Sequence, residues 1–315
     1  MPAARTRRAV RLNPRRAAGC SNHGIMKTTL PLPSPLPSLF LSHGSPMTAL
    51  EPGAAGAFWS RLGPAIDATF GRPRAILAIS AHSLTREPAL LAAARHEAVY
   101  DFGGFPDALY QLRYDAAGAP ALADEVQALL AARGIKAHRL ADGGLDHGIW
   151  TPLRSIYPDA GVPVLPLAFV PTQAPAEQFA LGQALAPLAA QGVLVVGSGS
   201  ITHNLRLLGA FNQRVDVSSP EIAESAAFRG WLRERARARD WDALFDYRRL
   251  APHAALMHPS DEHLLPWYVA AGVGGRDSVP LRLHDSITYG ALAMDAYAFG
   301  AQASKLEAAL AAPEE

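Results

Sequence analysis

Three histidines of this 315-residue chain each follow a short apolar run and are surrounded by small residues. They are His43, His82 and His203, at the ends of the segments 39–43, 76–82 and 193–203. Short apolar runs of this kind are typical of buried strands in a parallel sheet, and such sheets bind ligands beyond the carboxyl ends of their strands. Neutral imidazole is a very common metal ligand and a frequent general base. The pattern therefore predicts a metal site where these strands end.

Two further ligand candidates, Glu262 and His263, come just before a predicted helix. Alternatively, Ser260 or Asp261 caps the start of this helix and the other residues face solvent. The only cysteine, Cys20, lies in the N-terminal tail, so nitrogen and oxygen atoms must hold the metal. Three histidines with an open position suit hydrolytic Zn²⁺, whereas two histidines with a carboxylate suit Fe²⁺ that activates O₂. The residues alone leave this choice open.

Two predicted loops rich in glycine and aromatic residues are candidates for a substrate pocket. One places His147 between Asp146 and Trp150, and the other carries Phe102 and Phe105. Loops with many turn residues often carry binding groups. We expect His147 to contact the substrate and the three aromatic side chains to hold it, although each also fits packing in a core.

The glycine-rich turn before His203 resembles a phosphate-binding loop only superficially. It contains Gly197 and Gly199 but lacks the third glycine of a dinucleotide-binding motif, and no acidic residue ends a following strand at the expected distance. We expect the turn to present His203 instead, with Asn204 orienting the ring.

Apolar runs and helical periodicities alternate along the chain from residue 38 onwards. Strands are predicted at 38–42, 75–80, 162–169 and 193–196, helices at 54–62, 120–133, 176–190, 220–239, 241–250 and 263–271, and a closing strand pair within 281–292. Gly63-Pro64 is expected to end the first helix, while Pro163 and Pro166 indicate strand ends or an edge strand. The alternation is typical of a single α/β domain, with a mostly parallel or mixed central sheet flanked by helices and the metal site at the carboxyl ends of its strands.

Composition excludes two classes of partner. Hydrophobic residues make up 49% of the chain and charged residues 18%, and no apolar stretch approaches the roughly 20 residues of a membrane span. Six arginines and no acidic residue precede Met26; removing them from the 29 Lys and Arg leaves 23 against 28 Asp and Glu, a net charge of about −5. This mildly acidic remainder carries no nucleic-acid signature.

We expect residues 1–30 to be a disordered extension, or a mis-assigned start with Met26 as the true initiator. Residues 31–315 are then the catalytic domain. A chain with a single cysteine fits a reducing compartment, so we expect a cytoplasmic enzyme.

Six ordered motifs resemble those of a known family. They are Phe40-Leu-Ser-His43-Gly-Ser-Pro-Met47, Ser80-Ala-His82, Asp101-Phe-Gly-Gly-Phe-Pro106, Leu145-Asp-His147-Gly-Ile-Trp150, Gly199-Ser-Ile-Thr-His203-Asn-Leu205 and His258-Pro-Ser-Asp-Glu-His263. Their order and spacing, over roughly residues 37–300, resemble the 4,5-DOPA extradiol dioxygenases. These enzymes form a branch of the class III extradiol, protocatechuate 4,5-dioxygenase-like superfamily.

The resemblance implies an α/β fold with one divalent metal ion, Fe²⁺ or Zn²⁺, held by His43, His82 and His263. It implies that His203 is the acid/base or a further ligand, and that His147 lies on the substrate side. The wider superfamily has a glutamate as its third ligand, whereas the matching position here is His263, next to Glu262.

The activity that the resemblance implies is the insertion of O₂ into a catechol such as L-DOPA, which gives a muconate semialdehyde. A small aromatic diol and O₂ are therefore the expected partners. Two alternatives remain at this point, a zinc-dependent hydrolase and a non-redox, chelatase-like metal-binding protein.

Overall fold

An eight-stranded mixed sheet forms the centre of the computed structural model, which describes residues 34–208 and 215–312. Across the sheet the strands are β6 (His138–Leu140), β3 (Ala89–Leu91), β7 (Val164–Ala168), β2 (Ala75–Ser80), β8 (Val193–Gly199), β1 (Ser38–Ser42), β12 (Ala296–Phe299) and β9 (Leu281–His284). The four central strands β7, β2, β8 and β1 are parallel, whereas β3 is antiparallel to β7, and β12 to its neighbours β1 and β9. The predicted α/β domain with a mixed sheet is thus confirmed. The expectations for residues 1–30 lie outside the described part of the chain.

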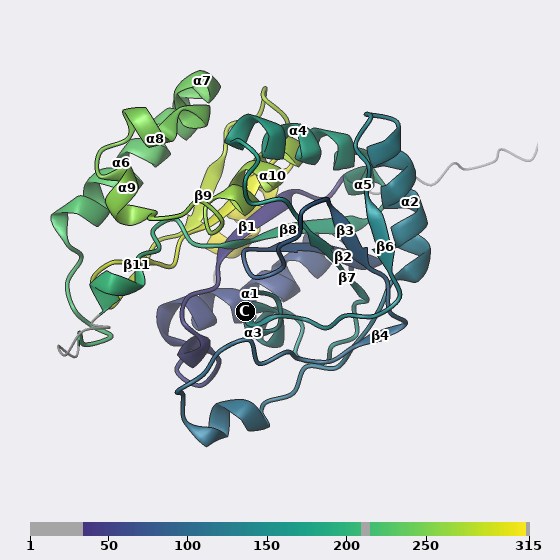
Figure 1. Cartoon of the computed structure of the whole chain (residues 1–315), viewed down its shortest axis with the longest axis horizontal. Coiled ribbons are helices and arrows are strands. Elements are labelled where there is room, and N and C mark those ends of the chain that lie inside the picture. The colour runs from purple at the N-terminus through teal and green to yellow at the C-terminus, as the bar shows by residue number, and fades with distance from the viewer. Residues whose placement is uncertain (1–33, 209–214, 313–315) are drawn as a thin grey trace, which may run out of the picture. The chain divides into compact units, whose positions relative to one another are not determined.

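Helices cover both faces of the sheet (Figure 1). They are α1 (Gly53–Phe70), α2 (Pro120–Ala131), α3 (His147–Ile156), α4 (Pro175–Leu185), α5 (Pro187–Ala190), α6 (Ala223–Ala238), α7 (Trp241–Phe245), α8 (Tyr247–Leu250), α9 (Ala254–Met257), α10 (Leu265–Gly274) and α11 (Ala303–Ala311). Short 3₁₀ turns η1 (Pro46–Ala49), η2 (Asp107–Gln111) and η3 (Leu205–Leu208) and the small ribbons β4 (Arg95–His96) with β5 (Ala116–Ala117) and β10 (Ile287–Thr288) with β11 (Leu292–Ala293) complete the described elements. No described helix has the length and apolarity needed to cross a bilayer.

Successive residues of the central strands face two different cores, as the two-residue period of a strand requires. In β1, Phe40 joins the core under α4 and α10, whereas Leu39 and Leu41 join the core under α1 and α3. The two faces of this sheet are therefore both apolar, which is why its strands appear in the sequence as continuous apolar runs.

Two expectations about proline are wrong. Pro64 lies inside α1, which continues to Phe70 because Leu62 and Ile66 on either side are fully buried. Pro166 belongs to β7, an interior strand. β7 pairs with β3 only at its last two residues, so Pro166, which has no N–H to donate, lies outside that pairing.

The expected closing strand pair is the β10–β11 ribbon. Three residues, 289–291, connect the two strands, and the first two of them, Tyr289 and Gly290, have positive φ angles of 52° and 67°. Glycine adopts a positive φ without steric cost, which suits Gly290 to this short loop.

Candidate metal centre and substrate cavity

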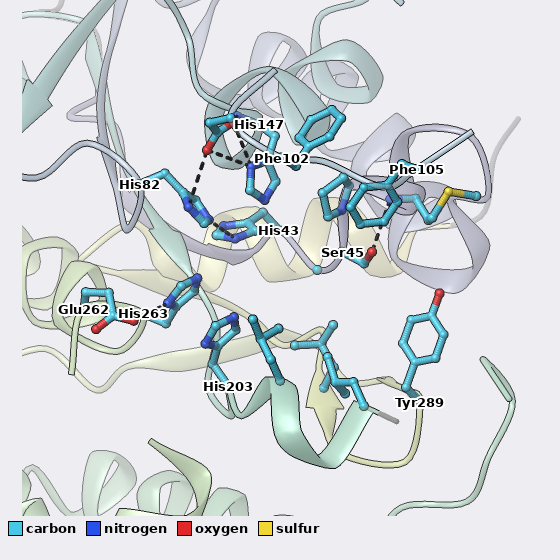
Figure 2. Close-up of a pocket in the computed structure, with 17 residues that line it drawn as sticks. His43, Ser45, His82, Phe102, Phe105, His147, His203, Glu262, His263 and Tyr289 are labelled. Atoms are coloured by element: carbon cyan, nitrogen blue, oxygen red, sulfur yellow. Dashed lines mark hydrogen bonds and ion pairs between the residues drawn. The ribbon is translucent and has the colours of Figure 1, made fainter. Parts of the chain in front are cut away.

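The strands that precede His43 and His82 flank β8, the strand that precedes His203. All three run parallel, so their carboxyl ends meet at one edge of the sheet. Main-chain bonds continue past the strand ends: the N–H of His43 donates to the carbonyl of Gly199 at 3.0 Å, and the residue before His82 bonds to β8 in the same way. His43 and His82 are thereby fixed at this edge, where they face each other (Figure 2).

His263 comes from a different part of the chain, two residues before α10. It reaches the same edge because Gly199 lets its main chain approach β8 closely: a Cβ at that glycine would lie 2.0 Å from the carbonyl oxygen of His263. The N–H of Ser200 donates to this carbonyl at 2.9 Å. The glycines of this turn thus allow a close approach of two main chains.

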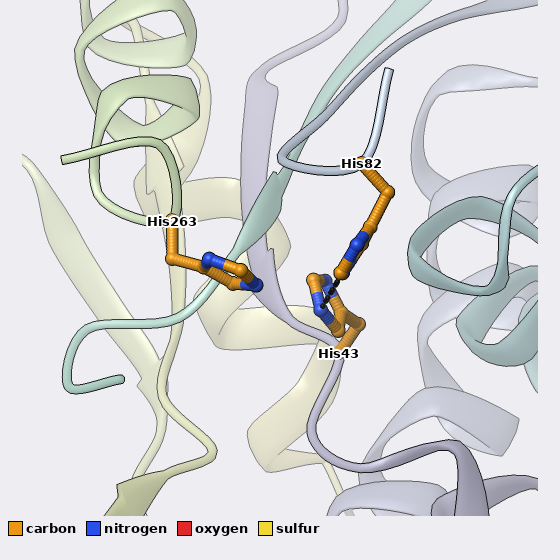
Figure 3. Close-up of side chains that lie close together, drawn as sticks. All are labelled: His43, His82 and His263. Atoms are coloured by element: carbon orange, nitrogen blue, oxygen red, sulfur yellow. Dashed lines mark hydrogen bonds between the residues drawn. The ribbon is translucent and has the colours of Figure 1, made fainter. Parts of the chain in front are cut away.

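Three imidazoles converge at this edge (Figure 3). His43, His82 and His263 each offer one nitrogen, and the three nitrogens lie within 4.8 Å of one another. The Nε2 atoms of His43 and His82 are 3.1 Å apart. The Nε2 atom of His263 is buried and has no hydrogen-bond partner in the described chain.

The Nδ1 atom of each of these imidazoles faces an acceptor. His43 Nδ1 donates to Ser198 Oγ at 3.0 Å, because the Ser198 hydroxyl itself donates to the Gly148 carbonyl at 2.5 Å. His263 Nδ1 donates to Glu262 Oε1 at 3.1 Å, and His82 Nδ1 lies 3.5 Å from Asp101 Oδ2. With the proton on Nδ1, each Nε2 keeps its lone pair. Acceptors behind metal-bound histidines orient them in this way.

Burial keeps these imidazoles neutral. It is the largest cause that lowers the pKa of His43 and His263 well below 6.5 and that of His82 to about 3, and the neighbouring histidines lower these pKa values further. A buried nitrogen with no partner is unfavourable, and a divalent metal ion relieves both the missing bond and the crowding of lone pairs. The described residues therefore fit one such ion.

His147 begins helix α3, although the sequence predicted a loop there. Its main-chain N–H donates to Asp101 Oδ1 at 3.0 Å, and its Nδ1 lies 3.0 Å from both oxygens of that carboxylate. Nδ1 therefore carries the proton, and Nε2 is the nitrogen left for a ligand in the cavity. Asp101 was not predicted as a site residue, because an aspartate in a turn-rich loop gives no sign of a distant histidine.

His203 lies against His263, with ring centroids 3.4 Å apart and planes inclined by 7°. Burial is the largest cause that lowers its pKa to about 4. Its main-chain N–H donates to the Met257 carbonyl at 2.8 Å. Asn204 does not orient this ring, contrary to expectation, because its side chain bonds to the Leu256 carbonyl and the N–H of Arg206.

A cavity of about 700 Å³ opens beside these histidines. Phe102 and Phe105 line it, as expected for a substrate pocket. Trp150 does not: its indole is fully buried beneath the loop and donates to the Val99 carbonyl at 3.1 Å, so the expectation that it contacts substrate is corrected. Tyr289, which the sequence did not single out, lines the far end of the cavity (Figure 2).

A family model described as the catalytic LigB subunit of aromatic ring-opening dioxygenase matches residues 37–300 of this chain. Among curated relatives, a 4,5-DOPA dioxygenase extradiol from Beta vulgaris is 37% identical over 83% of this chain and 96% of the relative. A protein of the same name from Escherichia coli is 34% identical over 82% and 93%.

The crystal structure of an Escherichia coli protein described as uncharacterized is also similar. It superposes with a TM-score of 0.68 at 30% identity, over 84% of this chain and 100% of that chain. The family resemblance expected from the six motifs is thus confirmed, and the hydrolase and chelatase alternatives lose their support. The chain belongs to the LigB family of aromatic ring-opening dioxygenases and is an extradiol ring-cleaving dioxygenase.

Proposed function

We propose that this chain cleaves a catechol next to its two hydroxyls, at one Fe²⁺ ion held by Nε2 of His43, His82 and His263. One observation carries the assignment: the Nδ1 atoms of these three histidines each face an acceptor, while their Nε2 atoms face one another. The ion, when bound, lowers the pKa of the catechol hydroxyls and brings the diol and O₂ together. We prefer Fe²⁺ to Zn²⁺ because Zn²⁺ has no redox chemistry to activate O₂.

His203 is the proton carrier in this proposal. It lines the cavity, it is neutral, and its ring is parallel to that of His263 rather than directed at the point where the three Nε2 atoms meet. A neutral imidazole there can accept a proton from a catechol hydroxyl and return it later in the reaction.

His147 and the aromatic side chains position the substrate. Asp101 fixes the proton of His147 on Nδ1, so Nε2 accepts a hydrogen bond from a substrate hydroxyl. Phe102 and Phe105, whose ring centroids lie 5.4 Å apart at an interplanar angle of 83°, hold the ring by apolar contact.

The substrate class comes from the relatives. Several are named for 4,5-DOPA, so L-DOPA is the reference substrate for a test. We propose residues 31–315 as the catalytic domain, acting in the cytoplasm on a small aromatic diol and O₂. Ring cleavage gives a muconate semialdehyde, which for L-DOPA can cyclise to a yellow compound.

An O₂ electrode tests the proposal. Protein loaded anaerobically with Fe²⁺ is mixed with air-saturated buffer and one catechol at a time, including L-DOPA. We expect O₂ uptake matched one to one by a ring-opened product. Absence of O₂ uptake with every catechol would contradict the proposal, and hydrolysis of an ester by the Zn²⁺ form without O₂ would favour the hydrolase.

A further inference from the structure

A carboxylate lies behind two of the three proposed ligand histidines. Asp101 Oδ2 is 3.5 Å from Nδ1 of His82, and Glu262 Oε1 is 3.1 Å from Nδ1 of His263. His43 differs, because its Nδ1 faces a serine hydroxyl at 3.0 Å. The Nδ1 atom of His43 is thus bonded to an uncharged acceptor, and any acidic group that acts on this imidazole must do so from further away.

Asp146 places a third carboxylate beside His43. A Cβ added to Gly148 would lie 3.1 Å from Asp146 Oδ1 and 3.0 Å from His43 Nδ1, so both atoms adjoin the same glycine. The side chain of Asp146 is buried, and this residue is not part of the cavity wall. Its carboxylate is therefore close to the metal centre without touching a substrate in the cavity.

Two serine hydroxyls hold the carboxylate of Asp146. Ser80 Oγ donates to Oδ1 and Ser83 Oγ donates to Oδ2, both at 2.6 Å. The Ser80 hydroxyl also accepts the main-chain N–H of His82 at 3.2 Å, so its own proton points to the carboxylate. Asp146 is thereby bonded to both ends of the turn 80–83, which carries His82.

Asp146 stands at the N-terminus of α3, but its side chain does not cap that helix. Its main-chain carbonyl accepts the N–H groups of Ile149 and Trp150, whereas its carboxylate makes no bond to the first turn. An aspartate in this position ordinarily accepts an N–H of the first turn. Helix capping by the side chain therefore does not account for this carboxylate.

The negative charge of Asp146 is unfavourable without a cation nearby. Burial is the largest cause that raises the pKa of this carboxyl, and the bonds from the two serines offset it only in part. A buried carboxylate attracts a divalent ion more strongly than an exposed one does, because less water screens the two charges from each other. An ion beside His43 would supply the missing positive charge.

We propose that Asp146 is a positioning residue of the metal centre. Through its two serine partners it fixes the turn that carries His82, and its buried negative charge beside His43 strengthens the binding of the divalent ion. The inference rests on the proposed function, since it takes the three histidines as ligands. It deepens that function, because the affinity for the ion then depends on a residue outside both the ligand set and the cavity wall.

Asp146→Asn separates this role from a purely structural one. Asparagine has the same shape, can accept a bond from one serine and donate to the other, and suits a helix N-terminus, but it carries no charge. Urea unfolding of the metal-free, full-length chain and an anaerobic Fe²⁺ titration are the two measurements. We expect the variant to unfold at the same or a higher urea concentration, because the uncompensated charge is gone, and to bind Fe²⁺ about 10–100-fold more weakly.

Asp240→Asn is the matched control. Asp240 is the N-cap of α7, and its carboxylate accepts the N–H of Ala243 at 3.3 Å, a bond that asparagine can also accept. We expect this variant to bind Fe²⁺ as the wild type does. Unchanged Fe²⁺ affinity in Asp146→Asn, or an equal loss in the control, would overturn the inference. A metal-free Asp146→Asn chain that is less stable than the wild type, or does not fold, would also overturn it.

Failure of this inference can be told apart from failure of the proposed function. Fe²⁺ affinity and unfolding are measured without O₂. A chain whose Fe²⁺ affinity depends on Asp146 as expected, but which takes up no O₂ with any catechol, would contradict the proposed function alone. A wild-type chain that binds no Fe²⁺ would contradict both.

Discussion

The rings of His203 and His263 are stacked, with centroids 3.4 Å apart and an angle of 7° between their planes. The lone pair of an imidazole nitrogen lies in the plane of its ring. Two parallel planes do not meet, so these two rings cannot direct their lone pairs at one point without moving. The stacking therefore supports the proposal that His203 carries a proton while His263 binds the metal.

His203→Ala should leave the metal bound and slow turnover by roughly 10² or more, because it removes the proton carrier and no ligand. Fe²⁺ content per chain and kcat with one catechol, measured on the same sample, check this. Loss of Fe²⁺ in this variant would identify His203 as a ligand instead.

Asp101→Asn should lower ring-cleavage turnover about tenfold or more. The amide removes the negative charge and one of the two oxygens that lie 3.0 Å from Nδ1 of His147, so the form of the imidazole with its proton on Nδ1 is stabilised less. Steady-state kinetics with one catechol measures the change. The control is Asp107→Asn, an exposed carboxylate of η2 outside the cavity wall. Full turnover in Asp101→Asn would show that His147 needs no fixed proton.

Gly199→Ala should destabilise the fold by about 1–3 kcal/mol and weaken Fe²⁺ binding, because its Cβ collides with the His263 carbonyl and pushes that segment off β8. Urea unfolding and an anaerobic Fe²⁺ titration measure the two effects. Gly230→Ala in α6 is the control. No atom lies near its added Cβ, so it should raise stability by up to about 1 kcal/mol without changing Fe²⁺ affinity.

Arg229→Met should destabilise the protein by about 3–5 kcal/mol, since it removes the bond at 2.8 Å to the fully buried carboxylate of Asp295 and leaves Arg282, at 3.2 Å, as the cation beside it. Replacing both residues, as Arg229→Met with Asp295→Asn, should recover much of that loss. Chemical denaturation of the two single variants and the double variant measures their coupling. If the changes in the free energy of unfolding of the two single variants add up to that of the double variant, the Arg229–Asp295 pair contributes no coupling energy.

The fold and part of the site follow from local sequence patterns. Apolar runs place His43 and His82 at strand ends, because a strand buried on both faces has to be apolar throughout. Their meeting requires only that the strands be parallel and close together in the sheet. His263 follows no strand. Its place just before a predicted helix makes it and Glu262 ligand candidates, and only the family motifs favour His263.

The remaining errors come from contacts between distant segments. An indole beside glycines can line a pocket or pack in the core, so the sequence alone could not place Trp150. Its N–H donates to the Val99 carbonyl, and the side chain is buried in the core. Pro64 was expected to end a helix that packing on both sides of it continues. The roles of Asp101 and Ser198 depend on histidines 46 and 155 residues away, which no local pattern contains.

The most direct test is an anaerobic Fe²⁺ titration of the metal-free protein, followed at each point by O₂ uptake with a catechol. We predict that uptake rises in proportion to bound Fe²⁺ up to one ion per chain. We also predict that His263→Ala loses both the tight site and the uptake, while His147→Ala keeps the site. Catechol-dependent O₂ uptake without Fe²⁺, or an unchanged titration in His263→Ala, would contradict the account.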